Sequence, residues 1–216
     1  MIRRLALLAF FCLAVTGCGE TSPAGAPAND MASSANAAAP VPAPDLARVR
    51  IETGMGAIIV ELDGRHAPIT TANFLAYVDQ RRFDGTVFYR AARTRGAEGR
   101  GFVQGGIRHS YRRMLAPIAH EPTSRTGLHH ADGTISMAHT DTSGAMGDFF
   151  ITVGAMPSMD AHGREPGFAA FGRVAEGMDV VRHILAAPTV ANAGSGAMRG
   201  QMLAAPVRIS SVRRVD

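Results

Sequence analysis

Residues 134–153 read TISMAHTDTSGAMGDFFITV and carry the clearest indication of the fold class. At the two ends of this stretch, Thr134–His139 (TISMAH) and Asp148–Val153 (DFFITV) are short runs rich in β-branched, aromatic and other apolar residues. Glycines and small polar residues separate the two runs, as is typical of short strands joined by a loop. The stretch therefore predicts two strands.

Similar runs occur on both sides of this stretch. Arg48–Thr53 and Ala57–Leu62 flank a Gly54-Met55-Gly56 turn and predict a hairpin. Many short strands separated by glycine and proline favour a closed antiparallel barrel over a parallel α/β sheet. The remaining strand-like runs are Thr86–Arg90, Gly101–Gln104, Phe168–Val174 and Pro206–Val212.

Only two segments have helical spacing. A helix can begin at Pro68, and it would place Phe74, Leu75 and Val78 on one face. Met178–Ala186 also has an apolar face, and it stops before Pro188. The sequence thus predicts a mainly β domain that carries two helices.

The N-terminal segment has a different character. A short positive start with Arg3 and Arg4 precedes the apolar run Leu5–Val15, which is the arrangement of a secretory signal. The run leads into Val15-Thr16-Gly17-Cys18, which resembles the bacterial lipoprotein signal, in which the cysteine becomes acylated after cleavage. An ordinary signal peptide with a chance cysteine is the alternative interpretation.

These features divide the chain into three parts. Residues 1–17 are predicted to be a signal peptide, 18–44 a lipidated Cys18 with a disordered Ala/Pro-rich linker, and 45–216 the folded domain. Acyl chains on Cys18 would anchor the protein to a membrane on the periplasmic side of the cell envelope. The residue after Cys18 is Gly19 and not an aspartate, which favours the outer membrane as the site of the anchor.

The composition excludes several classes of protein. The chain has 216 residues, 46% of them hydrophobic, which suits one folded domain with a tail. All 22 basic residues are arginines, so chemistry that needs a lysine amine is excluded. The net charge of +4, which falls once Arg3 and Arg4 are cleaved off, is too small to indicate nucleic-acid binding. No apolar stretch is long enough for a transmembrane helix.

Common catalytic signatures do not match. Ser195 lacks the glycine two positions earlier that a nucleophile elbow needs, and Gly54-Met55-Gly56 lacks the third glycine of a dinucleotide loop. Adjacent His129 and His130 would point to opposite sides of a strand, and no histidine or cysteine spacing completes a metal site. We therefore expect no metal and no cofactor, with a histidine-based metal protein as a remote alternative.

Several segments taken together resemble the cyclophilin family of peptidyl-prolyl isomerases. They are Phe88-Tyr89-Arg90, residues 102–106 (FVQGG), residues 133–139 (GTISMAH) and residues 148–151 (DFFI). The likeness continues through residues 168–174 (FAAFGRV) and 176–181 (EGMDVV), and upstream it includes residues 67–70 (APIT) and Asn73-Phe74. It runs in the same order from about Val49 to the C-terminus.

The resemblance implies a closed eight-stranded antiparallel β-barrel capped by two α-helices, with a peptide groove on one face. It also implies rotation about X-Pro bonds in proline-containing peptides and in unfolded or flexible client proteins, with no cofactor. Arg90 matches the catalytic arginine of the family, and Gln104 matches the glutamine that orients the substrate backbone. The residues matched to substrate binding are Phe102, Ala138, His139, Asp148, Phe150, Met159 and Phe168.

The chain departs from the family pattern between its arginine and its glutamine. Residues 91–100 intervene, and the segment from Gly101 to Gln104 is one residue short. Either Phe102 is the pocket phenylalanine, or it occupies the next position and Gly101 replaces the aromatic residue. We expect the insertion to be an exposed, mobile loop beside the groove that alters which peptides fit, unless it has no role. The shortened segment also leaves open a non-catalytic peptide-binding or chaperone module on the same fold.

Overall fold

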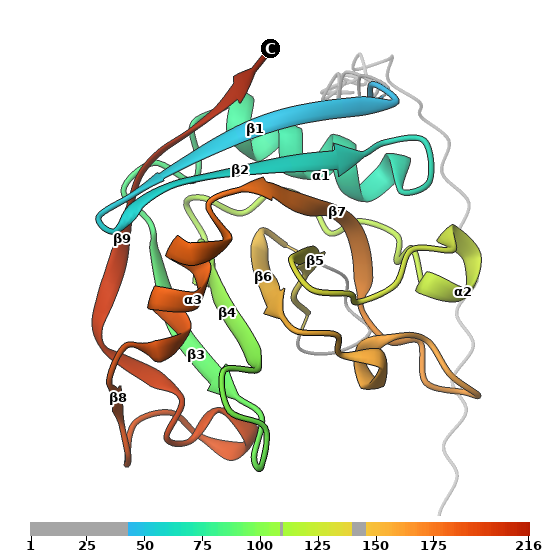
Figure 1. The fold of residues 1–216 in the computed structure, drawn as a ribbon. Coiled ribbons are helices and arrows are strands. Elements are labelled where there is room, and N and C mark those ends of the chain that lie inside the picture. Colours follow the sequence, from blue (N-terminus) through green and yellow to red (C-terminus); the bar gives the residue numbers. More distant parts are fainter. Residues whose placement is uncertain (1–42, 109, 140–145) are drawn as a thin grey trace, which may run out of the picture. The chain divides into compact units, whose positions relative to one another are not determined.

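The computed structural model describes residues 43–108, 110–139 and 146–216. Its strands form one antiparallel sheet in the order β1 (Leu46–Thr53), β2 (Gly56–Asp63), β7 (Ala169–Glu176), β5 (Thr134–Met137), β6 (Asp148–Val153), β4 (Gly101–Gly106), β3 (Val87–Arg93), β9 (Met202–Val215) and β8 (Thr189–Val190). Because β9 also pairs with β1, eight of these strands close into a barrel (Figure 1). The predicted eight-stranded antiparallel barrel is confirmed.

The barrel encloses an apolar core that the alternation of the strands predicts. Ile51, Val60 and Phe149 are fully buried, and so are residues of every long strand around them. Phe149 lies edge-on to Phe74 and Phe88, with ring centroids 5.5 Å and 5.7 Å apart. These aromatic contacts stabilise the centre of the barrel.

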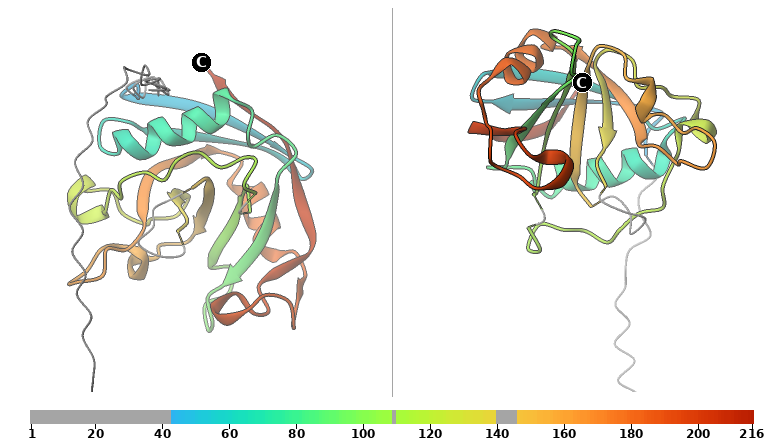
Figure 2. Two further views of the ribbon diagram at one scale, coloured as in Figure 1. Left: turned by 180° about the vertical axis from the view of Figure 1, so that it is seen from behind. Right: turned by 90° about the horizontal axis from the view of Figure 1, so that it is seen from below.

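Among the described residues, two helices of more than one turn pack on the barrel, as expected. Helix α1 (Pro68–Asp79) begins with a proline and packs against β2, β7 and β9. Helix α3 (Met178–Ala186) buries Val180, Val181, Ile184 and Leu185 against β2, β3, β4 and β6. Figure 2 shows the two helices from behind and from below.

The structure adds short elements that the sequence did not predict. They are α2 (Thr123–Thr126), two 3-10 turns named η1 (Pro157–Met159) and η2 (Gly196–Met198), and strand β8. No helix within the described residues is long and apolar enough to cross a membrane.

Several strand boundaries differ from the prediction. Strand β5 ends at Met137 rather than His139, although the Ala138 N–H still donates to the Asp148 carbonyl at 2.8 Å. Strand β9 is longer than Pro206–Val212, because its two ends pair with different neighbours, β3 and β1.

Strand β3 also runs on through Arg93 instead of ending at Arg90. The residues from Ala91 to Arg93 therefore lengthen a hairpin and are not part of an exposed loop, and Ala91 and Ala92 are buried. In this respect the expectation for residues 91–100 was wrong. The exposed loop is limited to residues 94–100, in which Ala97 is half-buried.

Candidate active site

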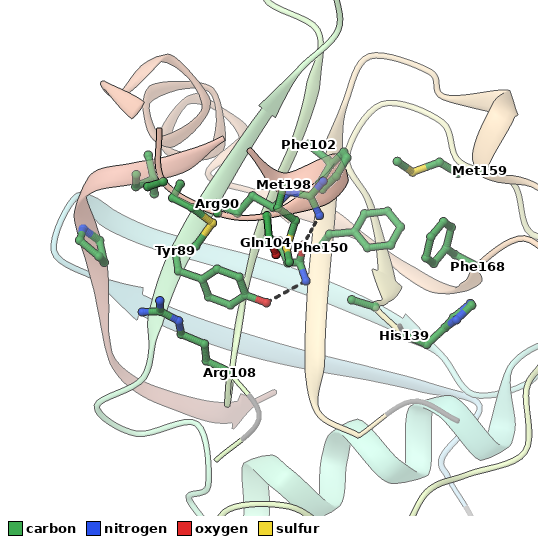
Figure 3. A pocket seen from close by; sticks show the side chains of 17 residues that line it. Tyr89, Arg90, Phe102, Gln104, Arg108, His139, Phe150, Met159, Phe168 and Met198 are labelled. Atoms are coloured by element: carbon green, nitrogen blue, oxygen red, sulfur yellow. Dashed lines mark hydrogen bonds between the residues drawn. The ribbon is translucent and has the colours of Figure 1, made fainter. Parts of the chain in front are cut away.

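A cavity of about 600 Å³ opens on one side of the barrel. Strand pairing places its central residues side by side, because Arg90 on β3 is opposite Gln104 on β4, which is opposite Phe150 on β6. Figure 3 shows these side chains around the opening. The lining residues are Tyr89, Arg90, Phe102, Gln104, Arg108, Ala138, His139, Phe150, Met159, Phe168, Ala193, Gly194, Ser195, Met198, Met202, Leu203 and Pro206.

A β-bulge determines which side chains of β3 reach the cavity. Successive residues of a regular strand point to opposite faces, yet Tyr89 and Arg90 both line the cavity. The pairing of β3 with β4 and with β9 shifts register between Phe88 and Arg90. A bulge of this kind re-aims a side chain, so the local irregularity brings the phenol and the guanidinium together.

The Arg90 guanidinium is held by two amide oxygens. Its Nη1 donates to Gln104 Oε1 at 2.9 Å, and its Nε donates to Gln201 Oε1 at 2.8 Å. Its carbon Cζ lies 4.8 Å from the centroid of the Phe102 ring. These contacts fix the plane of a group that is rigid, cationic and rich in donors.

Tyr89 completes this network and orients Gln104. Gln104 Nε2 donates to the Tyr89 hydroxyl at 2.8 Å, which directs the amide oxygen of Gln104 toward Arg90. Burial raises the pKa of Tyr89, and the nearby Asp148 carboxylate adds to this shift, so the phenol stays protonated. Burial lowers the pKa of Arg90, but a guanidinium remains charged in proteins.

Aromatic side chains form the other half of the cavity. Phe150 and Phe168 meet edge to face with centroids 5.3 Å apart, and the His139 ring lies 4.8 Å from Phe168. Met159, on η1, lines the same end. Figure 3 shows this group across Gln104 from Tyr89. The result is an apolar hollow that suits a small ring.

His130 supports the aromatic hollow from behind. Its ring is stacked on Phe150 with centroids 5.7 Å apart. Its Nδ1 lies 2.6 Å from Asp160 Oδ1, and its Nε2 lies 3.0 Å from Ser136 Oγ. Burial lowers the pKa of His130 despite the opposing effect of Asp160.

The expectation that His129 and His130 point to opposite sides was wrong. The two residues lie outside the strands, and both contact Asp160, with His129 Nδ1 3.1 Å from Oδ2. Burial acts to raise the pKa of Asp160, but hydrogen bonds from the two histidines lower it overall. Within the described part of the chain, no group of three potential ligands is arranged to hold a metal ion.

All but one of the predicted catalytic and substrate-binding residues line this cavity. Phe102 lies in it, and Gly101 pairs with Arg93 at the start of β4. Asp148 is the exception among the described residues: its carboxylate accepts a hydrogen bond from the Arg108 backbone N–H at 2.8 Å. Cys18 lies outside the described residues.

Sequence reasoning missed one whole wall of the cavity. Residues 193–195, Met198 and Met202 line it, and Gln201 reaches Arg90 from the same segment. This segment lacks the periodicity of a helix or strand and so gave no signal. The segment is nonetheless joined to β3 by a backbone hydrogen bond, because the Ala91 N–H donates to the Gln201 carbonyl at 2.9 Å.

A fixed cation beside an aromatic hollow defines a site for an apolar ring attached to a polar backbone. The family model described as "Cyclophilin type peptidyl-prolyl cis-trans isomerase/CLD" matches residues 48–214. The chain belongs to this family of peptidyl-prolyl cis-trans isomerases, which confirms the resemblance seen in the sequence.

Curated relatives and solved structures agree with this assignment. The chain is 37% identical to the Streptomyces antibioticus isomerase cyp18 over 69% of its own length and 89% of the relative's. It is 34% identical to an Acinetobacter baylyi isomerase over 76% of its length and 84% of the relative's. The fold resembles a Cryptosporidium parvum cyclophilin type isomerase with a TM-score of 0.59 at 20% identity, covering 79% of this chain and 98% of that one. A further structure of that protein, determined in the presence of the dipeptide Ala-Pro, matches with a TM-score of 0.60.

Proposed function

We propose that this chain accelerates cis/trans rotation about X-Pro bonds and that Arg90 is the catalytic residue. The observation that carries the proposal is the position of the Arg90 guanidinium, which lies on the Phe102 ring and is held by Gln104 at the edge of the aromatic hollow. This arrangement offers one cationic donor and one apolar pocket side by side. Both are what the reaction needs.

The chemistry requires no covalent intermediate and no proton transfer. In the planar ground state the imide nitrogen shares its lone pair with the carbonyl, and the barrier to rotation is about 18–20 kcal/mol. In the twisted transition state the lone pair is localised on nitrogen. A fixed donor aimed at this nitrogen or at the carbonyl therefore binds the twisted form better than the planar form.

The aromatic hollow supplies the second half of the mechanism. Phe150, Phe168 and Met159 would grip the proline ring while the preceding carbonyl turns. Because Gln104 and Gln201 already hold Arg90, little reorganisation is needed when charge develops. A reduction of the barrier by about 7 kcal/mol would give roughly a hundred-thousandfold acceleration.

The test is to follow isomerisation of a short X-Pro peptide with the full chain. We expect the rate to rise in proportion to the protein concentration. Peptide binding without acceleration would instead support the non-catalytic peptide-binding or chaperone module, and neither binding nor acceleration would overturn both hypotheses.

We further propose that the protein acts on flexible or unfolded client proteins in the cell envelope, anchored through a lipid on Cys18. The supporting observation is the signal-like segment that ends at Cys18, followed by an Ala/Pro-rich linker.

The test is to express the chain and its Cys18→Ser variant in a Gram-negative bacterium and to separate membranes from soluble protein. We expect the parent in a membrane fraction that is denser than the inner membrane, and the variant in the soluble fraction. If parent and variant distribute between the fractions in the same way, the anchor is excluded.

A further inference from the structure

The cavity extends beyond the proline-binding half that the proposed function uses. Figure 3 shows Arg108 and Tyr89 on one side of Gln104, with Phe150, Phe168 and His139 on the other. All of them line one continuous cavity. An extended peptide held at Arg90 would therefore meet Arg108 with a residue other than its proline.

Arg108 is a cation without a salt bridge among the described residues. It is exposed, and its guanidinium carbon lies 5.5 Å from the centroid of the Tyr89 ring. A guanidinium over an aromatic face is attracted to the ring but keeps N–H donors at its edge. These edge donors remain available for an incoming carboxylate.

The backbone that carries Arg108 is fixed. The Arg108 N–H donates to Asp148 Oδ1 at 2.8 Å, and the residue has a φ of 51°, in the left-handed region. The turn is preceded by Gly106, where a Cβ atom would lie 2.4 Å from the Gly147 carbonyl oxygen. The base of the side chain is thus anchored beside the cavity, although its end is solvent-accessible.

The charges around the cavity favour a ligand with an anionic side chain. Two arginines, Arg90 and Arg108, line the cavity, and no carboxylate does so among the described residues. The Asp148 carboxylate raises the pKa of Tyr89, but it is buried and already accepts the Arg108 N–H. Arg90 donates to two glutamines and is assigned to the proline bond, which leaves Arg108 as the cation for a client side chain.

We propose that Arg108 forms a second subsite that selects client peptides with an acidic side chain near the proline. Glutamate or aspartate would pair with the guanidinium through charge-assisted hydrogen bonds. This inference rests on the proposed function for the register of the peptide, because the proline fixes which residue reaches Arg108. The subsite would increase the affinity for acidic clients without taking part in bond rotation.

The test compares peptides that differ only in charge. One series carries glutamate at the second residue before or after proline, and the matched series carries glutamine there. Affinity for the full chain is measured by titration calorimetry. We expect one glutamate position to bind about fivefold more tightly than its glutamine partner, and we expect this ratio to fall toward one at high salt.

Substitutions then assign the effect to one side chain. In Arg108→Gln the ratio of the affinities for the glutamate and glutamine peptides should fall to about one. In Arg108→Glu the preference should reverse, so that a peptide with lysine at the same position binds more tightly. Arg112→Gln, which removes an exposed arginine outside the cavity lining, should keep the ratio. If Arg108→Gln does not fold, Arg108→Asn tests the same point, because asparagine tolerates a left-handed backbone.

The inference and the proposed function can fail separately. A ratio near one at both positions in the parent, or a ratio that persists in Arg108→Gln, overturns the acidic subsite even if every peptide is isomerised. Conversely, calorimetry does not depend on turnover, so an Arg108-dependent ratio without any isomerisation supports the subsite and overturns the catalytic proposal.

Discussion

Gln201 Oε1 accepts a hydrogen bond from Arg90 Nε at 2.8 Å, although the two residues are 111 positions apart in the chain. With Gln104 on Nη1, the guanidinium is held from two sides, by one glutamine from the neighbouring strand β4 and one from the segment that precedes β9. The site is therefore built by the chain's late segment as well as by the strands that carry the family motif.

Removal of Arg90 should abolish most of the catalysis without unfolding the protein. Arg90→Ala should lower kcat/KM for an X-Pro peptide by about 10²–10³-fold, because the fixed donor is lost. Arg90→Lys should recover little, since an ammonium cannot present a planar fork to two glutamines. Isomerisation rates and thermal unfolding of each variant provide the measurement. Arg95→Ala, on the exposed turn, is the control, and an undiminished rate in Arg90→Ala would refute the mechanism.

Gln201 should affect turnover more than binding. In Gln201→Ala the Arg90 guanidinium loses one of its two glutamine hydrogen-bond acceptors. We therefore expect kcat to fall about five- to tenfold with KM nearly unchanged. Steady-state kinetics with one peptide separates the two constants. Arg199→Ala, an exposed substitution in the same segment, should leave both constants at parent values. A rise in KM alone would mean that Gln201 contacts the peptide instead of positioning Arg90.

His130 should make the stability depend on pH below neutrality. Its pKa is lowered in the folded state by burial, so the unfolded chain binds a proton first as pH falls below about 6.5. The free energy of unfolding should then decrease with falling pH, by at most about 1.4 kcal/mol per pH unit from this one group. In His130→Asn this contribution should vanish, whereas it should persist in His183→Asn, an exposed substitution on α3. Urea unfolding at several pH values measures it, and identical slopes in His130→Asn and the parent would contradict the assignment.

Gly106 should be intolerant of a side chain. A Cβ atom there would lie 2.4 Å from the Gly147 carbonyl oxygen, and the φ of 126° is unfavourable for any other residue. Gly106→Ala should lower the free energy of unfolding by about 2–4 kcal/mol in urea denaturation. Gly96 also has a positive φ, of 74°, but nothing lies within 4 Å of its Cβ position. Gly96→Ala should therefore cost only about 1 kcal/mol, and equal losses in the two variants would exclude the steric explanation.

The barrel and the centre of the site could be predicted from the sequence because both depend on local patterns. Strand alternation separates Phe149, which faces the core, from Phe150, which faces the cavity. The motif residues Arg90 and Gln104 lie on paired strands, so their contact follows once the strands are aligned. For these residues, local sequence and tertiary structure agree.

The rest could not be predicted, for three physical reasons. Extra residues can lengthen either a loop or a hairpin, and only packing shows that Ala91 and Ala92 are buried in β3. The Gln201 segment is irregular, so its place beside Arg90 is set by tertiary contacts alone. Asp148 was assigned to substrate by position, and no sequence pattern indicates that its carboxylate accepts the Arg108 N–H.

The pairing of β1 with β9 also bears on how the barrel folds. Strand β9 pairs with β1 along one part of its length and with β3 along another, so a single strand supplies the seam of the barrel. Until β9 is in place, the edges of β1 and β3 are exposed, and exposed strand edges are sites for faulty association. Docking of this one strand therefore both completes the barrel and protects it from aggregation through its strand edges.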